Sequence, residues 1–112
     1  MEKSNIFVYV ELSKLTTSLS TDPSFCKKAL KAHAGYFNII DAKYFSSQLA
    51  TEWERILTLL KEKGPQLNQE GFIEKNAFRN TLFQMSSQQC IDLTNQILLL
   101  FEKVKIELGF IS

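Results

Sequence analysis

Residues 87–108 read SQQCIDLTNQILLLFEKVKIEL, and they carry the clearest helical pattern in this chain. Ser86 with Gln89 three residues later matches a capping box, and Gly109 suits the position just past a helix end. Counted at 100° per residue, seven apolar side chains form the stripe of a core-facing helix: Cys90, Leu93, Ile97, Leu100, Phe101, Val104 and Leu108. The sequence therefore predicts one long helix over Ser87–Leu108.

The opposite side of this predicted helix also carries apolar residues. Leu99 and Ile106 lie two turns apart, almost opposite the core stripe and beside Glu102 and Lys103. A helix that is apolar on two sides is either enclosed by its own domain or shared with a partner. The N-terminal Ile6, Phe7 and Val10 are the candidates for intramolecular cover. If a partner covers the helix instead, the predicted interface is Ile91, Leu98, Leu99, Glu102 and Ile106.

Four further helices are expected before it. The first spans residues 5–19, where Val8, Leu12, Leu15 and Leu19 recur at helical spacing, although Ile6–Val10 is also strand-prone. The second runs from Pro23 to Phe37, starting at Thr21-Asp22-Pro23, with the buried side formed by Phe25, Ala29, Ala32 and Tyr36 or Phe37. Its outer side carries a small group of basic residues: Lys27, Lys28 and Lys31.

The third predicted helix spans residues 42–63, with Asp41 as its cap and Gly64-Pro65 as its end. Trp53 lies in the middle of its apolar face, which consists of Phe45, Leu49, Trp53, Ile56, Leu57 and Leu60. Residues 64–71 are typical of a loop. A shorter helix over residues 72–85 then places Phe78, Leu82 and Met85 on one side.

These patterns predict an all-α fold for residues 1–112. Short connections favour an irregular antiparallel bundle of four main helices, with five as the alternative. A chain of 112 residues is too short for two ordinary cores, so we expect a single domain. The net charge of +1 gives no global argument for nucleic acid or for an anionic membrane.

The N-terminal residues and the cysteines favour a cytoplasmic protein. Residues 1–5 are typical of a native N-terminus, and the apolar run Ile6–Val10 is too short for a signal segment or a membrane span. Cys26 and Cys90 match no metal or disulfide pattern, so we expect buried free thiols and folding without metal or disulfide.

No arrangement of residues in the sequence points to catalysis. The single histidine, His33, stands among alanines and lysines, and no nucleophile motif is present. Glu52 and Glu54 diverge around a helix and cannot form a catalytic pair. We therefore expect a protein that is not an enzyme and that needs no cofactor.

Residues 79–84, RNTLFQ, resemble the Arg-Asn-x-x-x-His motif of the HEPN superfamily of helical ribonucleases and toxins. By that resemblance, Arg79 would hold an RNA phosphate and Asn80 would orient it. Gln84 stands where the family has its catalytic histidine, and an amide cannot transfer the proton. The resemblance covers six residues and implies a nucleic-acid-related domain without hydrolytic activity.

Two functions remain open at this point. The first is a small adaptor or regulatory protein that binds another protein, including a second copy of itself as a homodimer. The second is the HEPN-like domain, with Arg79, Asn80 and Gln84 as its phosphate contacts. The sequence leaves open whether Leu99 and Ile106 face a partner or the N-terminal segment.

Overall fold

The computed structural model describes residues 2–110, and these are mostly helical. Met1 and residues 111–112 of the predicted single domain lie outside the described part. In chain order the helices are α1 Ile6–Ser18, α2 Cys26–Ala32, α3 Tyr36–Ile39, the 3₁₀ turn η1 Ala42–Tyr44, α4 Ser47–Leu60, α5 Ala77–Gln84 and α6 Ser87–Leu108. A two-stranded sheet, β1 Gln66–Leu67 with β2 Ile73–Lys75, lies between α4 and α5. The prediction of a helical fold is confirmed apart from this sheet.

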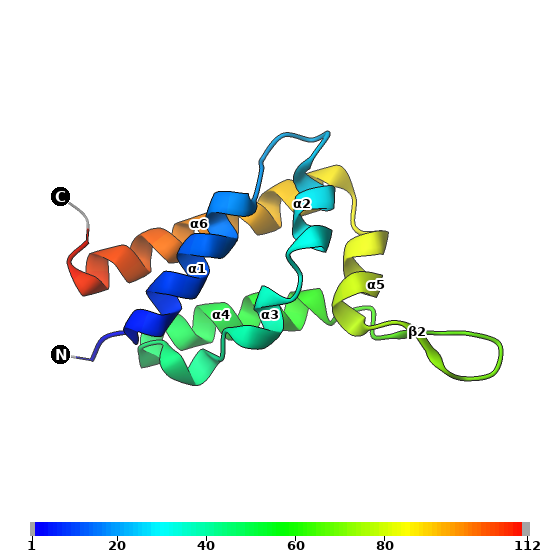
Figure 1. Ribbon diagram of the computed structural model, residues 1–112, viewed down its shortest axis with the longest axis horizontal. Coiled ribbons are helices and arrows are strands. Elements are labelled where there is room, and N and C mark those ends of the chain that lie inside the picture. Colours follow the sequence, from blue (N-terminus) through cyan, green and yellow to red (C-terminus); the bar gives the residue numbers. More distant parts are fainter. Residues whose placement is uncertain (1, 111–112) are drawn as a thin grey trace.

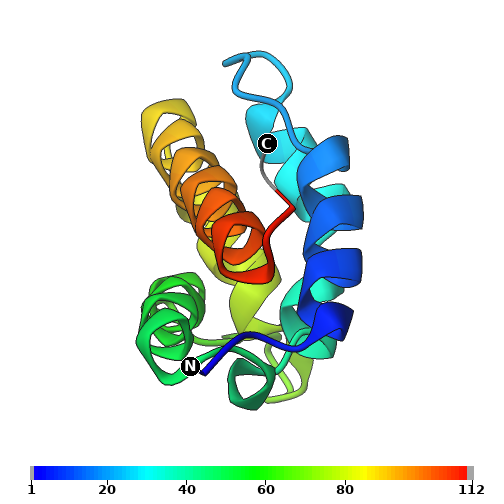
Figure 2. The same ribbon diagram turned by 90° about the vertical axis from the view of Figure 1, so that its left-hand side faces the viewer.

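Helix α6 lies at the centre of the molecule, as the apolar stripe of residues 87–108 predicts. It contacts α1, α2 and α4. Helix α1 crosses it in Figure 1, and Figure 2 shows α1 on one side of it and α4 on the other. Its start carries the predicted capping box of Ser86 and Gln89, and its end is Gly109 in the left-handed conformation, with φ of 75°. Within residues 2–110, no helix is long and apolar enough to cross a membrane.

The core gathers one apolar face from each of the longer helices. Trp53 of α4 is 0% exposed, and its indole N–H donates to the Ile40 carbonyl at 2.9 Å. Its ring stacks with Phe37 and Phe45 at centroid distances of 5.9 and 5.6 Å. From α1, Val8, Leu12 and Leu15 are buried, so the helical interpretation of residues 6–10 is confirmed.

Two predicted helices are broken in the structure. The segment 23–37 divides into α2 and α3, and Phe25 is exposed instead of buried, whereas Cys26 and Leu30 face the core. The segment 42–63 divides into η1, capped by Asp41, and α4, capped by Ser46. Each break coincides with a residue of non-helical backbone conformation. His33, with φ of −115° and ψ of 19°, follows the end of α2, and the extended Ser46, with ψ of 156°, caps α4.

The loop expected at residues 64–71 and the helix expected from residue 72 are partly wrong. Gln66 pairs with Lys75 and Leu67 with Ile73 in an antiparallel hairpin that projects from the helices (Figure 1). The Asn68 side chain accepts hydrogen bonds from the Glu70 and Phe72 amides and so shapes the turn. Helix α5 starts only at Ala77, with Asn76 as its cap.

The N-terminal segment joins the two ends of the described chain. The Glu107 carboxylate near the end of α6 accepts from the Ser4 amide at 3.0 Å, from the Ser4 hydroxyl at 2.7 Å and from the Ser46 hydroxyl. Glu2 accepts from the Ser47 amide at 2.8 Å, at the start of α4. The contacts therefore hold the start of α4 and the end of α6 in fixed positions.

Candidate functional site

The side of α6 that faces away from the core carries two exposed apolar side chains. Leu99 is 58% and Ile106 is 64% exposed. Helix α1 packs on another side of α6, where Tyr9 stacks on Phe101 at 5.7 Å between ring centroids. Three N-terminal side chains that could have covered Leu99 and Ile106 are themselves exposed: Ile6, Phe7 and Val10. Within residues 2–110, Leu99 and Ile106 are therefore left uncovered.

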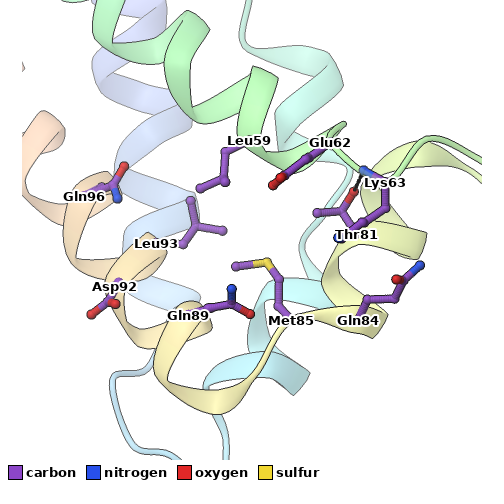
Figure 3. Close-up of a pocket in the computed structure, with 10 residues that line it drawn as sticks. All are labelled: Leu59, Glu62, Lys63, Thr81, Gln84, Met85, Gln89, Asp92, Leu93 and Gln96. Atoms are coloured by element: carbon purple, nitrogen blue, oxygen red, sulfur yellow. Dashed lines mark hydrogen bonds between the residues drawn. The ribbon is translucent and has the colours of Figure 1, made fainter.

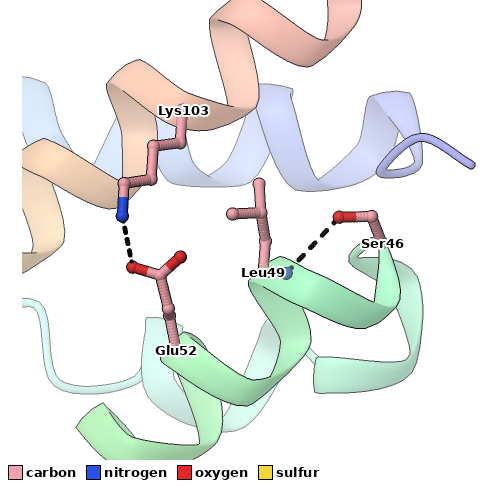
Figure 4. Close-up of polar contacts among 4 residues, drawn as sticks. All are labelled: Ser46, Leu49, Glu52 and Lys103. Carbon is pink, nitrogen blue, oxygen red and sulfur yellow. Dashed lines mark hydrogen bonds and ion pairs between the residues drawn. The ribbon is translucent and has the colours of Figure 1, made fainter.

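We call this surface the α4–α6 face, defined by Leu99, Glu102, Lys103 and Ile106 of α6 and Glu52 of α4. Two shallow hollows lie along it, one beside Leu99 and one beside Ile106, and Glu52 lines both. The Lys103 ammonium donates to Glu52 at 2.7 Å across the two helices (Figure 4). Lys105 pairs with Glu102 at 2.7 Å. The charged groups of this face are therefore matched within the chain.

The other predicted interface residues are less exposed. Ile91 and Leu98 are half-buried, and Ile91 packs against the core. Glu102 is exposed and lies between Leu99 and Ile106 on the helix surface. The apolar part of the face is therefore formed mainly by Leu99 and Ile106.

A second surface, the α2–α5 face, joins segments that the sequence keeps apart. We define it by Lys27 and Lys31 of α2, Lys75 of β2, and Arg79 and Phe83 of α5. Lys75 lies over the exposed Phe83 ring at 4.4 Å and Lys31 at 5.9 Å, and the Lys27 ammonium donates to the Phe83 carbonyl at 2.8 Å. Four of these side chains, with Glu74, line a hollow of about 250 Å³. Aliphatic lysine stems and an aromatic ring thus support a cationic surface.

The residues of the HEPN-like motif have different environments. Arg79 is exposed on the α2–α5 face. Asn80 is only 6% exposed, and its side-chain amide donates to the Gly64 carbonyl at 2.8 Å, which ties α5 to the segment just after α4. Gln84 is exposed and donates to Asn80 at 3.1 Å. The amide of Asn80 is therefore engaged inside the chain, whereas Arg79 is free to reach a ligand.

A further hollow, of about 260 Å³, lies between α4, α5 and α6. Figure 3 shows Leu59, Met85 and Leu93 pointing toward one another at its apolar side and the Glu62 carboxylate directed into it. Glutamine side chains and Asp92 complete the rim. This arrangement offers hydrogen-bond donors and acceptors to a small polar molecule, and none of its ten lining residues is a cysteine or histidine.

The two cysteines lie inside the fold. Cys26 and Cys90 are buried free thiols, and the Cys26 sulfur lies 3.2 Å from the Thr94 hydroxyl. Burial raises the pKa of the Cys90 thiol, and the neighbouring Cys26 raises it further, against a smaller lowering by Lys27. The Cys90 thiol therefore stays protonated near neutral pH. Both buried cysteine side chains act as small apolar core groups.

Sequence reasoning missed the partners that the fold supplies to Arg79. The sequence placed Arg79 beside Phe83 but gave Lys75 no role, because helical periodicity put Lys75 on no common face with Lys27 and Lys31. Within residues 2–110 no group of three or more potential metal ligands occurs. Protein-family models, curated proteins and solved structures were all compared with this chain, and none of them matches it.

Proposed function

We propose that this protein acts by protein–protein interaction, without catalysis of its own, and that it self-associates through the α4–α6 face. The observation that carries the proposal is the exposure of Leu99 and Ile106, at 58% and 64%, on the central helix. Burying two such side chains against a partner removes apolar surface from water, at a gain of about 1.5–3 kcal/mol for each fully buried side chain.

A second copy is a suitable occupant because the face is complementary to itself. Leu99 and Ile106 are seven residues apart, so their midpoint lies between Glu102 and Lys103. A two-fold axis through that midpoint sets two copies of α6 antiparallel and places Leu99 of one copy opposite Ile106 of the other. It also places Glu102 opposite Lys103 of the second copy. The two apolar pairs then lie on either side of central charges of opposite sign, which complement one another across the axis.

Sedimentation velocity of the wild type and of a Leu99→Glu, Ile106→Glu variant tests the proposal. We expect the wild-type mass to rise with concentration and the variant to stay monomeric, because the variant buries four carboxylates in the interface. The matched control is Phe72→Glu, Ile73→Glu in the hairpin, where the two side chains are 70% and 65% exposed. A wild type that remains monomeric at high micromolar concentration would contradict self-association.

A charge swap tests the antiparallel geometry. Glu102→Lys alone should weaken association, since it places a lysine opposite Lys103 of the second copy. Adding Lys103→Glu together with Glu52→Lys should restore much of it, because the pair across the interface and the ion pair between α4 and α6 are then both reversed but complementary. Loss of association in both variants would argue against the two-fold arrangement and leave the exposed face to another protein.

A further inference from the structure

Acidic and basic residues are segregated along this chain. Residues 23–40 and 75–91 contain no aspartate or glutamate, but they hold five of the thirteen basic residues: Lys27, Lys28, Lys31, Lys75 and Arg79. The other eight basic and twelve acidic residues give the rest of the chain a formal charge of −4. The net charge of +1 is therefore an average over two regions of opposite sign.

The fold brings the two basic segments together. Helix α2 contacts α5, and the side chains of Lys27, Lys31 and Lys75 converge on Phe83, at the distances given above. Among residues 2–110, no carboxylate lies within 4 Å of any of the five cationic groups, whereas three of the eight basic residues elsewhere are paired: Lys14, Lys103 and Lys105. Glu74 is the one acidic residue in the hollow beside Phe83. The cations of the α2–α5 face thus keep their attraction for an external anion.

One exposed aromatic ring lies among these cations, and two others are close to them in the sequence. Phe83 is 55% exposed at the centre of the α2–α5 face, and Phe25 is 58% exposed two residues before Lys27. Phe72 is 70% exposed in the hairpin, three residues before Lys75. Cationic side chains interleaved with exposed rings are what a flexible nucleic-acid strand requires, because its phosphates bind the cations and its bases stack on the rings.

We propose that the α2–α5 face binds single-stranded nucleic acid. Lys27, Lys31, Lys75 and Arg79 contact phosphates, and Phe83, which is 55% exposed, offers the accessible part of its ring to a base. The exposed rings favour this ligand over an acidic protein segment, which needs the cations but gains nothing from stacking. The acidic remainder of the chain repels the strand and so directs it to this face. Neither Asn80 nor the α4–α6 face takes part in this binding.

Fluorescence anisotropy with labelled oligouridylate and oligothymidylate of about 12 nucleotides tests the proposal across a salt series. Each phosphate contact contributes about −0.7 to the slope of log K against log salt for single strands. A Lys31→Gln, Lys75→Gln variant should therefore bind more weakly, and its slope should be less negative than that of the wild type by about 1.4. The matched control, Lys14→Gln with Lys43→Gln, removes two exposed lysines elsewhere. Its affinity and its salt slope should both equal those of the wild type.

Phe83→Leu separates stacking from charge. Loss of one stacked base should weaken oligonucleotide binding by about 5- to 150-fold while leaving the salt slope unchanged. Poly-glutamate of the same length should compete poorly. Circular dichroism melts of every variant check that the fold is kept. No binding of either oligonucleotide at low salt overturns the proposal. Equal competition by poly-glutamate together with unchanged binding by Phe83→Leu also overturns it, in favour of an acidic protein partner.

Discussion

The α4–α6 and α2–α5 faces both combine charged with exposed apolar side chains, but the charges are paired on the first face and unpaired on the second. On the α4–α6 face, Lys103 and Glu102 each have a partner of opposite charge at 2.7 Å, and the exposed apolar groups beside them are aliphatic. On the α2–α5 face the cations have no carboxylate within 4 Å among the described residues, and the exposed group between them is an aromatic ring. One face has its charges neutralised, and the other keeps them free.

The two faces can therefore gain binding energy from a partner in different ways. Paired charges make little further contribution to binding, so the α4–α6 face gains mainly from covering Leu99 and Ile106. Unpaired cations attract counterions that a polyanion releases, so the α2–α5 face gains mainly from charge, with a strong dependence on salt. Salt should therefore weaken ligand binding at the α2–α5 face much more than association at the α4–α6 face.

Truncation of the core should have the largest consequence, because it disrupts both faces together. Both rest on the core around Trp53, so Trp53→Ala should lower the free energy of unfolding by about 3–5 kcal/mol, because it leaves a large cavity. Urea denaturation followed by circular dichroism measures the loss. Phe72→Ala, which truncates a 70% exposed ring, should stay within about 0.5 kcal/mol of the wild type. A similar small loss for Trp53→Ala would show that the two faces do not depend on a shared core.

Loss of the Glu107 carboxylate, on the α4–α6 side of the molecule, should lower the free energy of unfolding less, and by an amount that depends on pH. Burial acts to raise the pKa of Glu107, but hydrogen bonds from Ser46 and Ser4 and the charge of Lys3 outweigh it, and the net pKa lies below the ordinary value. A lowered pKa in the folded state stabilises the protein above the unfolded pKa, and this stabilisation is lost as pH falls through the folded value. Glu107→Gln should therefore cost about 1–2 kcal/mol at neutral pH.

The pH series decides whether that cost arises from the carboxylate charge. As pH falls below about 4.3, the difference in unfolding free energy between the wild type and Glu107→Gln should shrink. Glu54→Gln, an exposed change on α4, serves as the control and should show little difference at any pH. A constant gap between the wild type and Glu107→Gln down to acid pH would contradict the assigned role of the charge.

The smallest effects should have opposite signs on the two faces. Lys103→Gln breaks a partly exposed ion pair and should cost about 0–1 kcal/mol. Lys31→Gln removes a like-charge neighbour of Lys27 one turn away on α2, and should stabilise the fold by about 0.2–0.5 kcal/mol. Urea denaturation at low and high salt measures both. Added salt should shrink each difference, and a destabilised Lys31→Gln would mean that the cations of the α2–α5 face are not in excess.

The longest helices could be predicted because their information is periodic and local. Helix α6 starts and ends at the predicted residues, since the capping box, the apolar stripe and Gly109 are all sequence patterns. The second helix was predicted too long, and its buried side was shifted by one residue from Cys26 to Phe25. The break at Ser46 escaped prediction because Phe45 and Leu49 on either side of it both face the core and so continue the apolar pattern.

The rest depended on contacts between distant segments. Strands of two and three residues carry no readable alternation, so the hairpin resembled a loop, although Asn68 and Gly71 mark its turn. The exposure of Leu99 and Ile106 was an open alternative until the position of α1 was known. The α2–α5 face was missed because a net charge averages over the chain, whereas the distribution of acidic residues along the sequence reveals it.

The hydrogen bonds between Ser4 and Glu107 have a consequence for folding kinetics. They join residues 103 positions apart in the sequence, so forming them requires closure of nearly the whole chain. The entropy of that closure must be lost before the contact contributes any stability, which places the contact late on the folding route. An interaction that forms after the transition state slows unfolding and leaves the folding rate almost unchanged. The N-terminal segment therefore determines mainly how long the folded chain persists once it has formed.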